Sequence, residues 1–597
     1  MPQTTCSRKT AAGSKKSVSH GHLPAAREGR HPLYAALTMV YTQLMEMLRI
    51  QISPDKEILV PPGLSAEEVL NLAEPGPSLY PPVAVFINNE LASLSTPVHA
   101  NCSLAPVYPD TPMGTEVYRR SLCFLLALAA RELAPDRRLT VSMAIGNGYY
   151  HYFDDNRPVD RPLLESLALR MREIVSQNLP IKTVSHSWAE ALAYFQTSRQ
   201  QDTVALLEYC NDPFVQLNEC GPFKDLHIAP LVPRTGMLRV WELIPYHRGM
   251  LLRFPHTKSP DEMDTFVDSP VLYRVAEEYE HKAKVLGAGS IGALNRINQS
   301  GSIQDFILEA EALQNKKLGQ IADYIAARAD RVKVILIAGP SSSGKTTTAK
   351  KLSIHLKILG FKPIPIELDN YFVNRDRTPV GPDGKPDFEC LEALDVSFLN
   401  EQLVDLFEGK EIELPLYDFK SGTRKMSGRK ISLKNNEILI LEGIHGLNEQ
   451  LTPQIPASHK LKIYVSALTQ LNIDDHNRVR TTDYRLLRRM VRDHNFRGHD
   501  ARATLSMWSN VQRGERRYIF PFQNSADIAF NSALDYELGV LKVFAEPLLQ
   551  VIKPNDPEYA DARRIQAFIS RISPISPQYV PSDSTLREFI GGSVFKY

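Results

Sequence analysis

Eight consecutive residues, Gly339 to Thr346, have the types and the spacing of a loop that binds phosphate groups. They read Gly-Pro-Ser-Ser-Ser-Gly-Lys-Thr and fit the pattern GxxxxGK[ST] at every fixed position. Glycines let backbone N–H groups face a phosphate chain, and the start of a following helix adds a positive dipole. Lys345 would reach the terminal phosphates, and the Thr346 hydroxyl would ligate Mg²⁺. The residues predicted to contact the nucleotide are Gly339, Pro340, Ser341, Ser342, Ser343, Gly344, Lys345, Thr346 and Thr347.

Two carboxylates lie where predicted strands end. Glu442 closes the apolar run 437–441, from where it could hold the same Mg²⁺ directly or through water. Asp369 follows the strand-like residues 361–368. Because sites in doubly wound sheets lie at the carboxyl ends of the strands, Asp369 should face the terminal phosphate and could take a proton from an acceptor hydroxyl. The alternative for each acid is a structural role at the end of its strand.

An arginine-rich segment follows further along the chain. Arg485, Arg489 and Arg492 recur at i, i+4 and i+7, so a helix would place them on one face. Guanidinium groups suit phosphate oxygens, and phosphoryl transfer gains from charge neutralisation. We predict a lid in which Arg489, Arg492 and Arg497 close over the transferring group, with Gly498 as its end or hinge. A solvated basic helix is the alternative.

A parallel α/β sheet is the element predicted to position these groups. Residues 332–338 form a buried-type strand before the phosphate loop, and residues 347–359 form the helix after it. Strands and helices alternate to about residue 475, and the chain is predicted helical from there to about residue 572. No NKxD element follows the loop, which disfavours a GTPase of the Ras type.

Together these motifs resemble the uridine kinase/phosphoribulokinase family over roughly residues 331–550. The segments that carry the resemblance are Asp369-Asn-Tyr-Phe, Phe388-Glu389 with Asp395, Pro415–Phe419, Leu441–Ile444 and Arg488–Asp493. The resemblance implies a P-loop kinase that uses ATP and Mg²⁺, with Asp369 as the catalytic base and a further Mg²⁺ contact. It also implies acceptor contacts from Glu389, Tyr417 and Arg489. The catalytic residues are then Lys345, Asp369, Arg489, Arg492 and Arg497, and the metal contacts are Thr346, Asp369 and Glu442.

The chain departs from that family at three positions. Gly422 stands where uridine kinases have a base-reading histidine, His499 where they have a second lid arginine, and Met507 where a glutamine is expected. A site that hydrogen-bonds its substrate discriminates strongly, so these changes should alter specificity rather than chemistry.

The N-terminal half resembles the start of threonyl-tRNA synthetase. Residues 46–108 are similar to a TGS domain, and residues 109–256 to the editing-type second additional domain. In the synthetase that second domain carries an HxxxH and a CxxxH pair, which here read Arg120…Phe124 and His227…Leu231. One histidine does not make a metal site, so we expect a scaffold without editing chemistry.

The predicted organisation is α/β, with a P-loop sheet flanked by helices and preceded by two smaller α+β domains. Helices are expected over 118–133, 161–177 and 303–328. The predicted parts are a basic, disordered tail (1–45), the TGS-like domain (46–108), the synthetase-like domain (109–256), a helical linker (257–330), the kinase-like domain (331–575) and a C-terminal tail (576–597).

Composition narrows the class of protein. Among 597 residues the formal net charge is +1, which disfavours a general polyanion binder. The longest apolar run, 122–130, is far shorter than the roughly 18–20 residues that a membrane span needs. The six cysteines form no CxxC pair, which disfavours a disulfide framework or zinc knuckle and favours the cytoplasm.

Three functions are compatible with these patterns. The leading interpretation is ATP-dependent phosphoryl transfer to the 5′-hydroxyl of a nucleoside. A second keeps the kinase but changes the acceptor to a sugar phosphate or a pantothenate-like alcohol, with Lys420, Arg424 and Lys425 near Tyr417. A third is an ATP-binding regulator that associates with RNA through the TGS-like region and the basic tail. The oligomeric state is left open.

Overall fold

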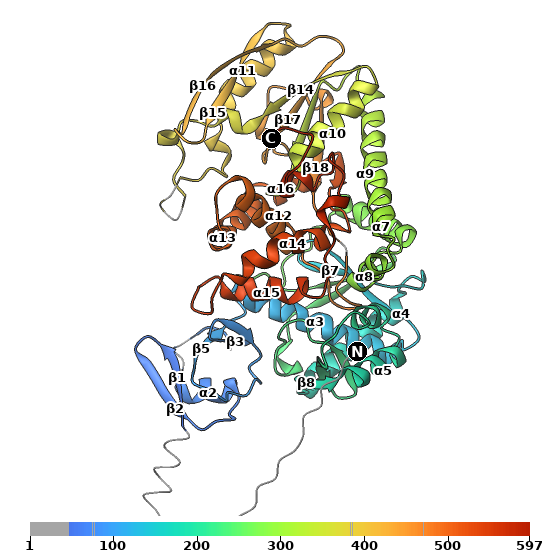
Figure 1. Cartoon of the computed structure of the whole chain (residues 1–597), viewed down its shortest axis with the longest axis vertical. Coiled ribbons are helices and arrows are strands. Elements are labelled where there is room, and N and C mark those ends of the chain that lie inside the picture. The colour runs from blue at the N-terminus through green and yellow to red at the C-terminus, as the bar shows by residue number, and fades with distance from the viewer. Residues whose placement is uncertain (1–46, 75, 77, 382–383, 385, 470) are drawn as a thin grey trace, which may run out of the picture.

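The computed structural model describes residues 47–597, apart from 75, 77, 382, 383, 385 and 470. The predicted basic tail, 1–45, lies outside the described residues. Two N-terminal units form one end of the molecule and a parallel sheet with its helices forms the other (Figure 1). Within the part of the chain described, no helix is long and apolar enough to cross a membrane.

The first unit is a small five-stranded sheet with one helix against it. The strands pair in the order β2-β1-β5-β3-β4. Ser65 caps the helix in a reciprocal capping box with Glu68, and the apolar face of the helix is buried on the sheet. The elements are β1 (Leu48–Ser53), β2 (Lys56–Val60), α2 (Ala66–Ala73), β3 (Ala84–Ile87), β4 (Glu90–Ala92) and β5 (Cys102–Val107).

The second unit packs two antiparallel sheets around one long, apolar helix. That helix, α3 (Pro112–Leu133), is buried along most of its length between the sheets, ordered β11-β12-β7-β6 and β10-β9-β8. The other elements are β6 (Leu139–Ala144), β7 (Gly148–Phe153), α4 (Arg161–Gln177), β8 (Lys182–Ser187), α5 (Trp188–Thr197), α6 (Gln201–Leu207), β9 (Phe214–Cys220), β10 (Phe223–Leu226), β11 (Glu242–Tyr246) and β12 (Gly249–Arg253). The predicted helix 161–177 is confirmed.

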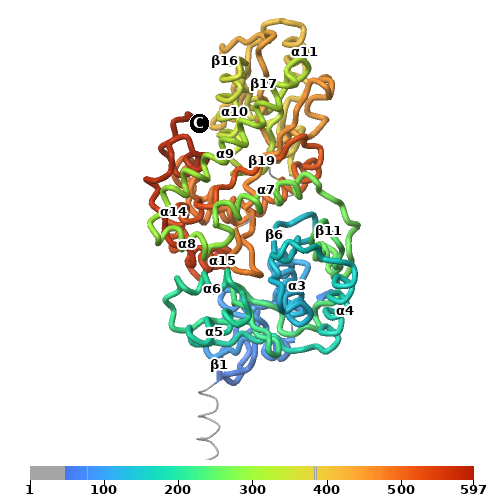
Figure 2. The backbone as a smooth tube through the Cα atoms, turned by 90° about the vertical axis from the view of Figure 1, so that its right-hand side faces the viewer, coloured from blue at the N-terminus to red at the C-terminus, as the bar shows by residue number. Residues whose placement is uncertain are grey.

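Three helices then connect the N-terminal units to the parallel sheet. They are α7 (Pro270–Leu286), α8 (Ile291–Gln299) and α9 (Ile303–Ala326). Figure 2 shows α9 running up one side of the molecule toward α10. The last turns of α9 pack into the core of the sheet through Ile321 and Ile325, so this helix is an integral part of the sheet's packing.

The parallel sheet has five strands in the order β14-β17-β13-β18-β19. All five residues of the central strand are buried, as expected when helices cover both faces. The strands are β13 (Val334–Ala338), β14 (Lys362–Glu367), β17 (Glu437–Glu442), β18 (Lys460–Ser466) and β19 (Ile528–Asn531); a hairpin of β15 (Ile412–Asp418) and β16 (Thr423–Ile431) lies apart. The predicted fold class is confirmed.

Helices complete this region. They are α10 (Lys345–Ile358), α11 (Val396–Phe407), α12 (Thr481–Phe496), α13 (Ala501–Tyr518), α14 (Glu537–Gln550), α15 (Tyr559–Ile569) and α16 (Arg587–Ile590). The prediction that 475–572 is helical throughout is wrong at β19. This strand has only four residues, too few to show a periodicity, and it exists because it pairs with β18.

One hydrophobic core crosses from the second N-terminal unit into the parallel-sheet region. Leu217 of β9 and Ile307 of α9 belong to the same buried cluster as Met490 of α12, Leu541 of α14 and Phe589 of α16. Residues distant in sequence therefore stabilise each other, and the two halves are joined through buried apolar contacts rather than a linker alone.

Candidate active site

The predicted phosphate loop connects β13 directly to α10, as the sequence pattern requires. Gly339 passes so close to β18 that a Cβ atom would lie 1.8 Å from the Val465 carbonyl oxygen. Gly344 has φ +79°, a left-handed conformation that favours glycine, and α10 begins at the next residue. Both glycines are therefore required by the backbone path, and the N-terminal end of α10 points into the loop.

Lys345 and Thr346 meet Glu442 at the edge of the sheet. The Lys345 ammonium lies 3.8 Å from one Glu442 carboxylate oxygen, and the Thr346 hydroxyl donates a 3.1 Å hydrogen bond to the other. The pairing of β13 with β17 brings Ile337 opposite Glu442 and so sets this meeting. Burial raises the pKa of Glu442 to about 7, although the Lys345 ammonium opposes the rise.

Asp369 reaches the same edge from the neighbouring strand. It lies in a short turn just after β14, whose last residue, Glu367, pairs with Glu442. Its carboxyl is open to solvent on the cavity side. Protein atoms on its other sides raise its pKa by burial, and the Lys345 ammonium opposes that rise. The structure thus brings Asp369, Lys345 and Glu442 together.

The oxygen donors at this edge suit a hard divalent cation. Thr346 and Glu442 are in contact, and Asp369 lines the same cavity. Among the described residues no three His, Cys, Asp or Glu side chains form a metal cluster. Mg²⁺ does not require one, because it is usually held by one or two carboxylates together with substrate phosphates and water.

A wall of aromatic rings and one acid forms the other side of the cavity. Tyr417 and Phe372 lie 5.5 Å apart between ring centroids, and Phe419 packs against Tyr417 at 5.1 Å. The Tyr417 hydroxyl is buried, and no described residue hydrogen-bonds to it. Burial, reinforced by nearby Glu515, raises the pKa of Glu389 to about 7. A polar acceptor could satisfy both groups.

The predicted lid helix is α12, and it is packed into the core. Leu486, Leu487 and Met490 are fully buried, so the helix is anchored and does not stand free over the site. It ends at Phe496, and Gly498 follows with φ +68°, which confirms Gly498 as the end of the segment.

The arginines of α12 divide into two groups. Arg485 is buried and paired with Glu515 at 2.7 Å, and it donates a 3.1 Å hydrogen bond to the Ser341 carbonyl. Arg488 is likewise buried, paired with Glu537, and bonded to the Ser342 carbonyl at 3.3 Å. Arg485 and Arg489 both contact Ser341, which agrees with the predicted shared face. The Arg485 guanidinium is buried against Glu515, however, and does not line the cavity.

The second group faces the cavity. Arg489 donates a 2.8 Å hydrogen bond to the Ser341 hydroxyl. Arg489, Arg492 and Arg497 all line the cavity and gather around Asp493, at 3.1, 2.8 and 3.7 Å. Their placement matches the predicted position beside the phosphate loop, with one buried carboxylate holding three guanidinium groups.

Two of the three positions at which the sequence differs from uridine kinases, Gly422 and His499, can be placed relative to the cavity. Gly422 has φ +70°, and a Cβ there would lie 2.8 Å from the Arg375 side chain. Arg375 lines the cavity, and it hydrogen-bonds the Phe419 carbonyl. The place beside Gly422 is thus filled by an arginine. His499 donates its backbone N–H to the Asp493 carbonyl at 3.2 Å, just beyond the helix.

The C-terminal segment also lines the site, which no sequence motif indicated. Glu588 accepts a 2.5 Å hydrogen bond from the Thr347 hydroxyl, at the start of α10. Tyr597 lies 2.8 Å from the same hydroxyl, and Lys350 of α10 hydrogen-bonds the Lys596 carbonyl. Figure 1 places the C-terminal end beside α10. Leu586 and Phe589 are fully buried beneath, so this predicted tail is a packed part of the structure.

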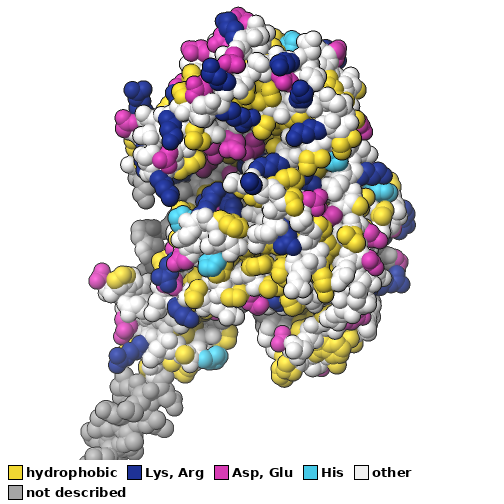
Figure 3. Space-filling view, turned by 45° about the horizontal axis from the view of Figure 1, so that its top comes forward, with side chains coloured by type: hydrophobic (Ala, Val, Ile, Leu, Met, Phe, Trp, Pro, Cys, Tyr) yellow, Lys and Arg dark blue, Asp and Glu magenta, His cyan; other side chains and the backbone are white. Residues whose placement is uncertain are grey.

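The phosphate loop, the carboxylates, the aromatic wall and the outer arginines of α12 surround one cavity of about 960 Å³. Acidic and basic side chains gather in the hollowed part of the face shown in Figure 3. The cavity extends from the phosphate loop past Asp369 to the aromatic wall, with the α12 arginines and the C-terminal segment at its sides. Its volume and lining suit two substrates, one anionic and one with a planar or apolar part.

Comparisons with known proteins divide the chain into two parts. Residues 334–538 match the model of the "Phosphoribulokinase / Uridine kinase family". Threonine–tRNA ligases match over the N-terminal regions: that of Syntrophotalea carbinolica is 32% identical over 193 residues, covering 30% of this chain and 30% of the relative. That of Burkholderia orbicola is 32% identical over 193 residues, covering 31% and 30%. The chain spans less than a third of the length of these relatives.

Among solved structures, the chain is similar to a putative fructose transport system kinase from Silicibacter at 14% identity, covering 36% of this chain and 98% of that one, with a TM-score of 0.26. It is also similar to a possible uridine kinase from Bacillus stearothermophilus at 21% identity, covering 36% and 98%, with a TM-score of 0.23. The parallel-sheet region, residues 334–538, thus matches the phosphoribulokinase/uridine kinase family, and it follows N-terminal regions similar to those of threonine–tRNA ligases.

Proposed function

We propose that the protein is a kinase that uses ATP and Mg²⁺ to phosphorylate the 5′-hydroxyl of a nucleoside. One observation carries the proposal: a phosphate loop, two carboxylates and an aromatic wall with an unpartnered tyrosine hydroxyl face a single cavity. A protein that binds a nucleotide only as a regulatory signal would not need the aromatic side of that cavity, beyond the phosphate loop.

The first half of the cavity would hold the phosphates of ATP. The loop amides, the start of α10 and Lys345 would bind them, and Arg485 and Arg488 would keep the loop in shape through its carbonyls. Thr346, Glu442 and Asp369 would hold Mg²⁺, which neutralises charge on the transferring group when it is bound.

The second half would hold the acceptor and carry out the proton transfer. Glu389 and Tyr417 would orient the nucleoside so that its hydroxyl faces Asp369. As the acceptor oxygen bonds to the γ-phosphorus, the bond to the leaving ADP breaks and Asp369 takes the hydroxyl proton. The raised pKa of Asp369 makes it a better base than an ordinary aspartate. Arg489, Arg492 and Arg497 would neutralise the developing charge.

The test measures ADP release from Mg²⁺-ATP with a panel of nucleosides. We expect a nucleoside-dependent rate that falls by at least about 100-fold in Lys345→Ala and in Asp369→Asn. The exposed residues Lys357 and Asp376 supply matched controls, and Lys357→Ala and Asp376→Asn should keep the full rate. Near-normal turnover in either site variant would refute these roles.

A kinase of a phosphorylated acceptor is a second candidate, favoured by Arg375. This residue lines the cavity beside Gly422, where it could bind an acceptor phosphate. Arg424 is already paired with Asp395 at 2.7 Å, and neither Lys420 nor Lys425 lines the cavity. Ribulose 5-phosphate and pantothenate therefore belong in the acceptor panel. ATP binding without any acceptor-dependent rate would instead favour the RNA-associated regulator.

A further inference from the structure

One segment of the parallel-sheet region, residues 471–480, is inserted into the second N-terminal unit. Asn472 donates a 2.9 Å hydrogen bond to the Val141 carbonyl, and Asp475 accepts 3.0 and 2.9 Å hydrogen bonds from Thr203. The segment continues directly into α12, which carries the arginines of the active site. Residues of this segment line two cavities.

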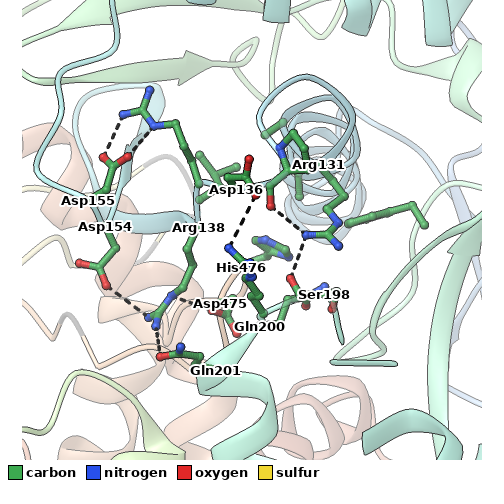
Figure 4. Close-up of a pocket in the computed structure, with 17 residues that line it drawn as sticks. Arg131, Asp136, Arg138, Asp154, Asp155, Ser198, Gln200, Gln201, Asp475 and His476 are labelled. Carbon is green, nitrogen blue, oxygen red and sulfur yellow. Dashed lines mark hydrogen bonds and ion pairs between the residues drawn. The ribbon is translucent and has the colours of Figure 1, made fainter. Parts of the chain in front are cut away.

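In the first cavity the arginine and aspartate side chains are equal in number. Its volume is about 290 Å³, and its lining includes four arginines and four aspartates. Figure 4 shows Arg138 reaching from one wall toward Asp154 and Asp475. Arg138 lies 3.0 Å from Asp475 and Arg137 2.8 Å from Asp155. The protein compensates its own charges here, and nothing indicates an anionic ligand.

The second cavity is different, because arginines outnumber acids in its lining. We call Arg120 of α3, Arg478 and Arg480 of the inserted segment, and Arg564 of α15 the arginine cluster. The only carboxylates among the described lining residues are Glu116 and Asp483.

Arg480 and Arg564 form ion pairs with those two carboxylates. Glu116 lies 3.3 Å from Arg480 and also 3.6 Å from Arg119, outside the cluster. Asp483 pairs with Arg564. Within the described part of the chain, no hydrogen bond or ion pair holds the guanidinium group of Arg120 or of Arg478. Arg478 lies over the Tyr149 ring, 5.3 Å from its centroid.

The surroundings add one carboxylate and one guanidinium group: Asp561 lies 2.6 Å from Arg564, and Arg119 shares Glu116 with Arg480. His476, which also lines this cavity, already pairs with Asp225 at 3.1 Å. Burial lowers the pKa of nearby His227 to about 4, so that imidazole is neutral. With Arg119 and Asp561 included, five guanidinium groups share three carboxylates, which leaves an excess of two positive charges around this small cavity. Such an excess is costly unless an anion compensates it.

We infer that the arginine cluster is a binding site for a phosphate-sized oxyanion. Planar guanidinium forks match phosphate oxygens, and a dianion would neutralise the excess. The cavity volume of about 70 Å³ has room for such an ion and is too small for a nucleoside. A bound oxyanion would link α3, α15 and the start of α12, and so would stabilise the joint between the two halves of the chain.

The test titrates inorganic phosphate into the full chain by calorimetry. The phosphate loop is expected to bind phosphate too, so Lys345→Ala is titrated in parallel to remove that component. The cluster is tested in the double variant Arg120→Gln/Arg478→Gln. Arg563→Gln is the matched control, because Arg563 lies on the exposed side of the same helix as Arg564.

We expect one saturable site to persist in Lys345→Ala and to weaken by at least about tenfold in the double variant, while Arg563→Gln binds as the parent chain does. Phosphate should raise the melting temperature of the parent but not of the double variant. Loss of all binding in Lys345→Ala, or unchanged binding in the double variant, would overturn the site. If the proposed kinase activity is not found, phosphate binding at the arginine cluster should still be observed.

Two further measurements keep the inference testable. If the double variant does not fold, Arg478→Lys keeps the charge but removes the fork, and it should weaken phosphate several-fold; unchanged affinity would count against the site. Competition by glycerol 2-phosphate would support an oxyanion carried on a phosphate ester, and lack of competition would support the inorganic ion.

Discussion

At the residue scale, the candidate site depends on where neighbouring strands end. Lys345, Asp369 and Glu442 come from three separate segments of the chain, yet each lies at or beyond the carboxyl end of a strand of the same parallel sheet. This placement explains how the groups affect one another. Burial raises the pKa values of Asp369 and Glu442, and the Lys345 ammonium opposes both rises. The chemistry of each group is thus set by its neighbours as much as by its type.

Tyr417→Phe tests the acceptor side at this scale. The ring packs against Phe372 and Phe419, whereas the buried hydroxyl has no partner among the described residues. Removing the hydroxyl should leave the melting temperature unchanged or slightly higher. It should raise KM for the acceptor by about tenfold, because a hydrogen bond to the substrate is lost. Steady-state kinetics and thermal melting measure the two effects; a lower melting temperature with unchanged KM would assign the hydroxyl a structural role.

His476 allows a pH-dependence to be predicted. Its contact with Asp225, and the proximity of Asp474 and Asp475, raise its pKa to about 9 despite burial. A histidine whose folded-state pKa is raised contributes stability below its unfolded value, near 6.5, and that contribution is lost as pH rises through 9. The melting temperature should therefore fall between pH 6.5 and 9, with a contribution on the order of 3 kcal/mol from this group.

The matched variant for that prediction is His476→Gln. Glutamine can still hydrogen-bond Asp225 but does not titrate, so the melting temperature of this variant should change less over the same pH interval. An equally steep fall in the variant would mean that other groups cause the dependence.

At the element scale, the C-terminal segment and α12 hold the phosphate loop from two sides. α12 holds the loop carbonyls through two buried arginines, each paired with a carboxylate. Such pairs are costly to break because the remaining charge is left buried. The C-terminal segment covers the start of α10, with Thr585 and Glu588 against Gly344 and Thr347. A loop held on both sides is preorganised for phosphate.

Glu588→Gln tests the role of that segment. The Glu588 carboxylate lies at the positive end of α10, where an anion is favoured and where nucleotide phosphates would approach. Glutamine keeps the hydrogen bond to Thr347 but removes the repulsion, so ATP should bind several-fold more tightly. Glu401→Gln, on the exposed face of α11, is the control. Weaker ATP binding in Glu588→Gln would show that the carboxylate assists the nucleotide site.

At the scale of the whole molecule, the buried core that crosses between the halves makes them one cooperative unit. The apolar residues of α12 and α14 are buried against α8, α9 and the second N-terminal unit. Exposing that surface would be costly, because roughly 25 cal/mol is lost per Å² of apolar area returned to water.

A truncated chain that begins at residue 331 tests this unity. We expect it to lack a cooperative melting transition and to aggregate, since α12 and α14 would expose apolar surface. Circular dichroism melting and size-exclusion chromatography report the outcome. A monodisperse, ATP-binding fragment would show instead that the parallel-sheet region folds without its N-terminal partner.

Several features could be predicted because their signals are local. The GxxxxGK[ST] loop, the strand before it and helix 161–177 depend on a few adjacent residues and on periodicity, and all three are found. The fold class follows from the alternation of strands and helices. The burial of Arg485 and the strand β19 could not be predicted in the same way, because each depends on a partner distant in sequence, Glu515 and β18 respectively.

The sequence by itself determined the phosphate loop, the acids at the strand ends and the class of fold, because glycine conformation, side-chain chemistry and hydrophobic periodicity act over short distances. Only the tertiary structure decided that Arg485 is buried beneath the phosphate loop, that residues from 587 to 597 help to line the cavity, and that four arginines from three distant segments share one small space. Those outcomes depend on long-range packing and on buried charge, and neither leaves a pattern in adjacent residues.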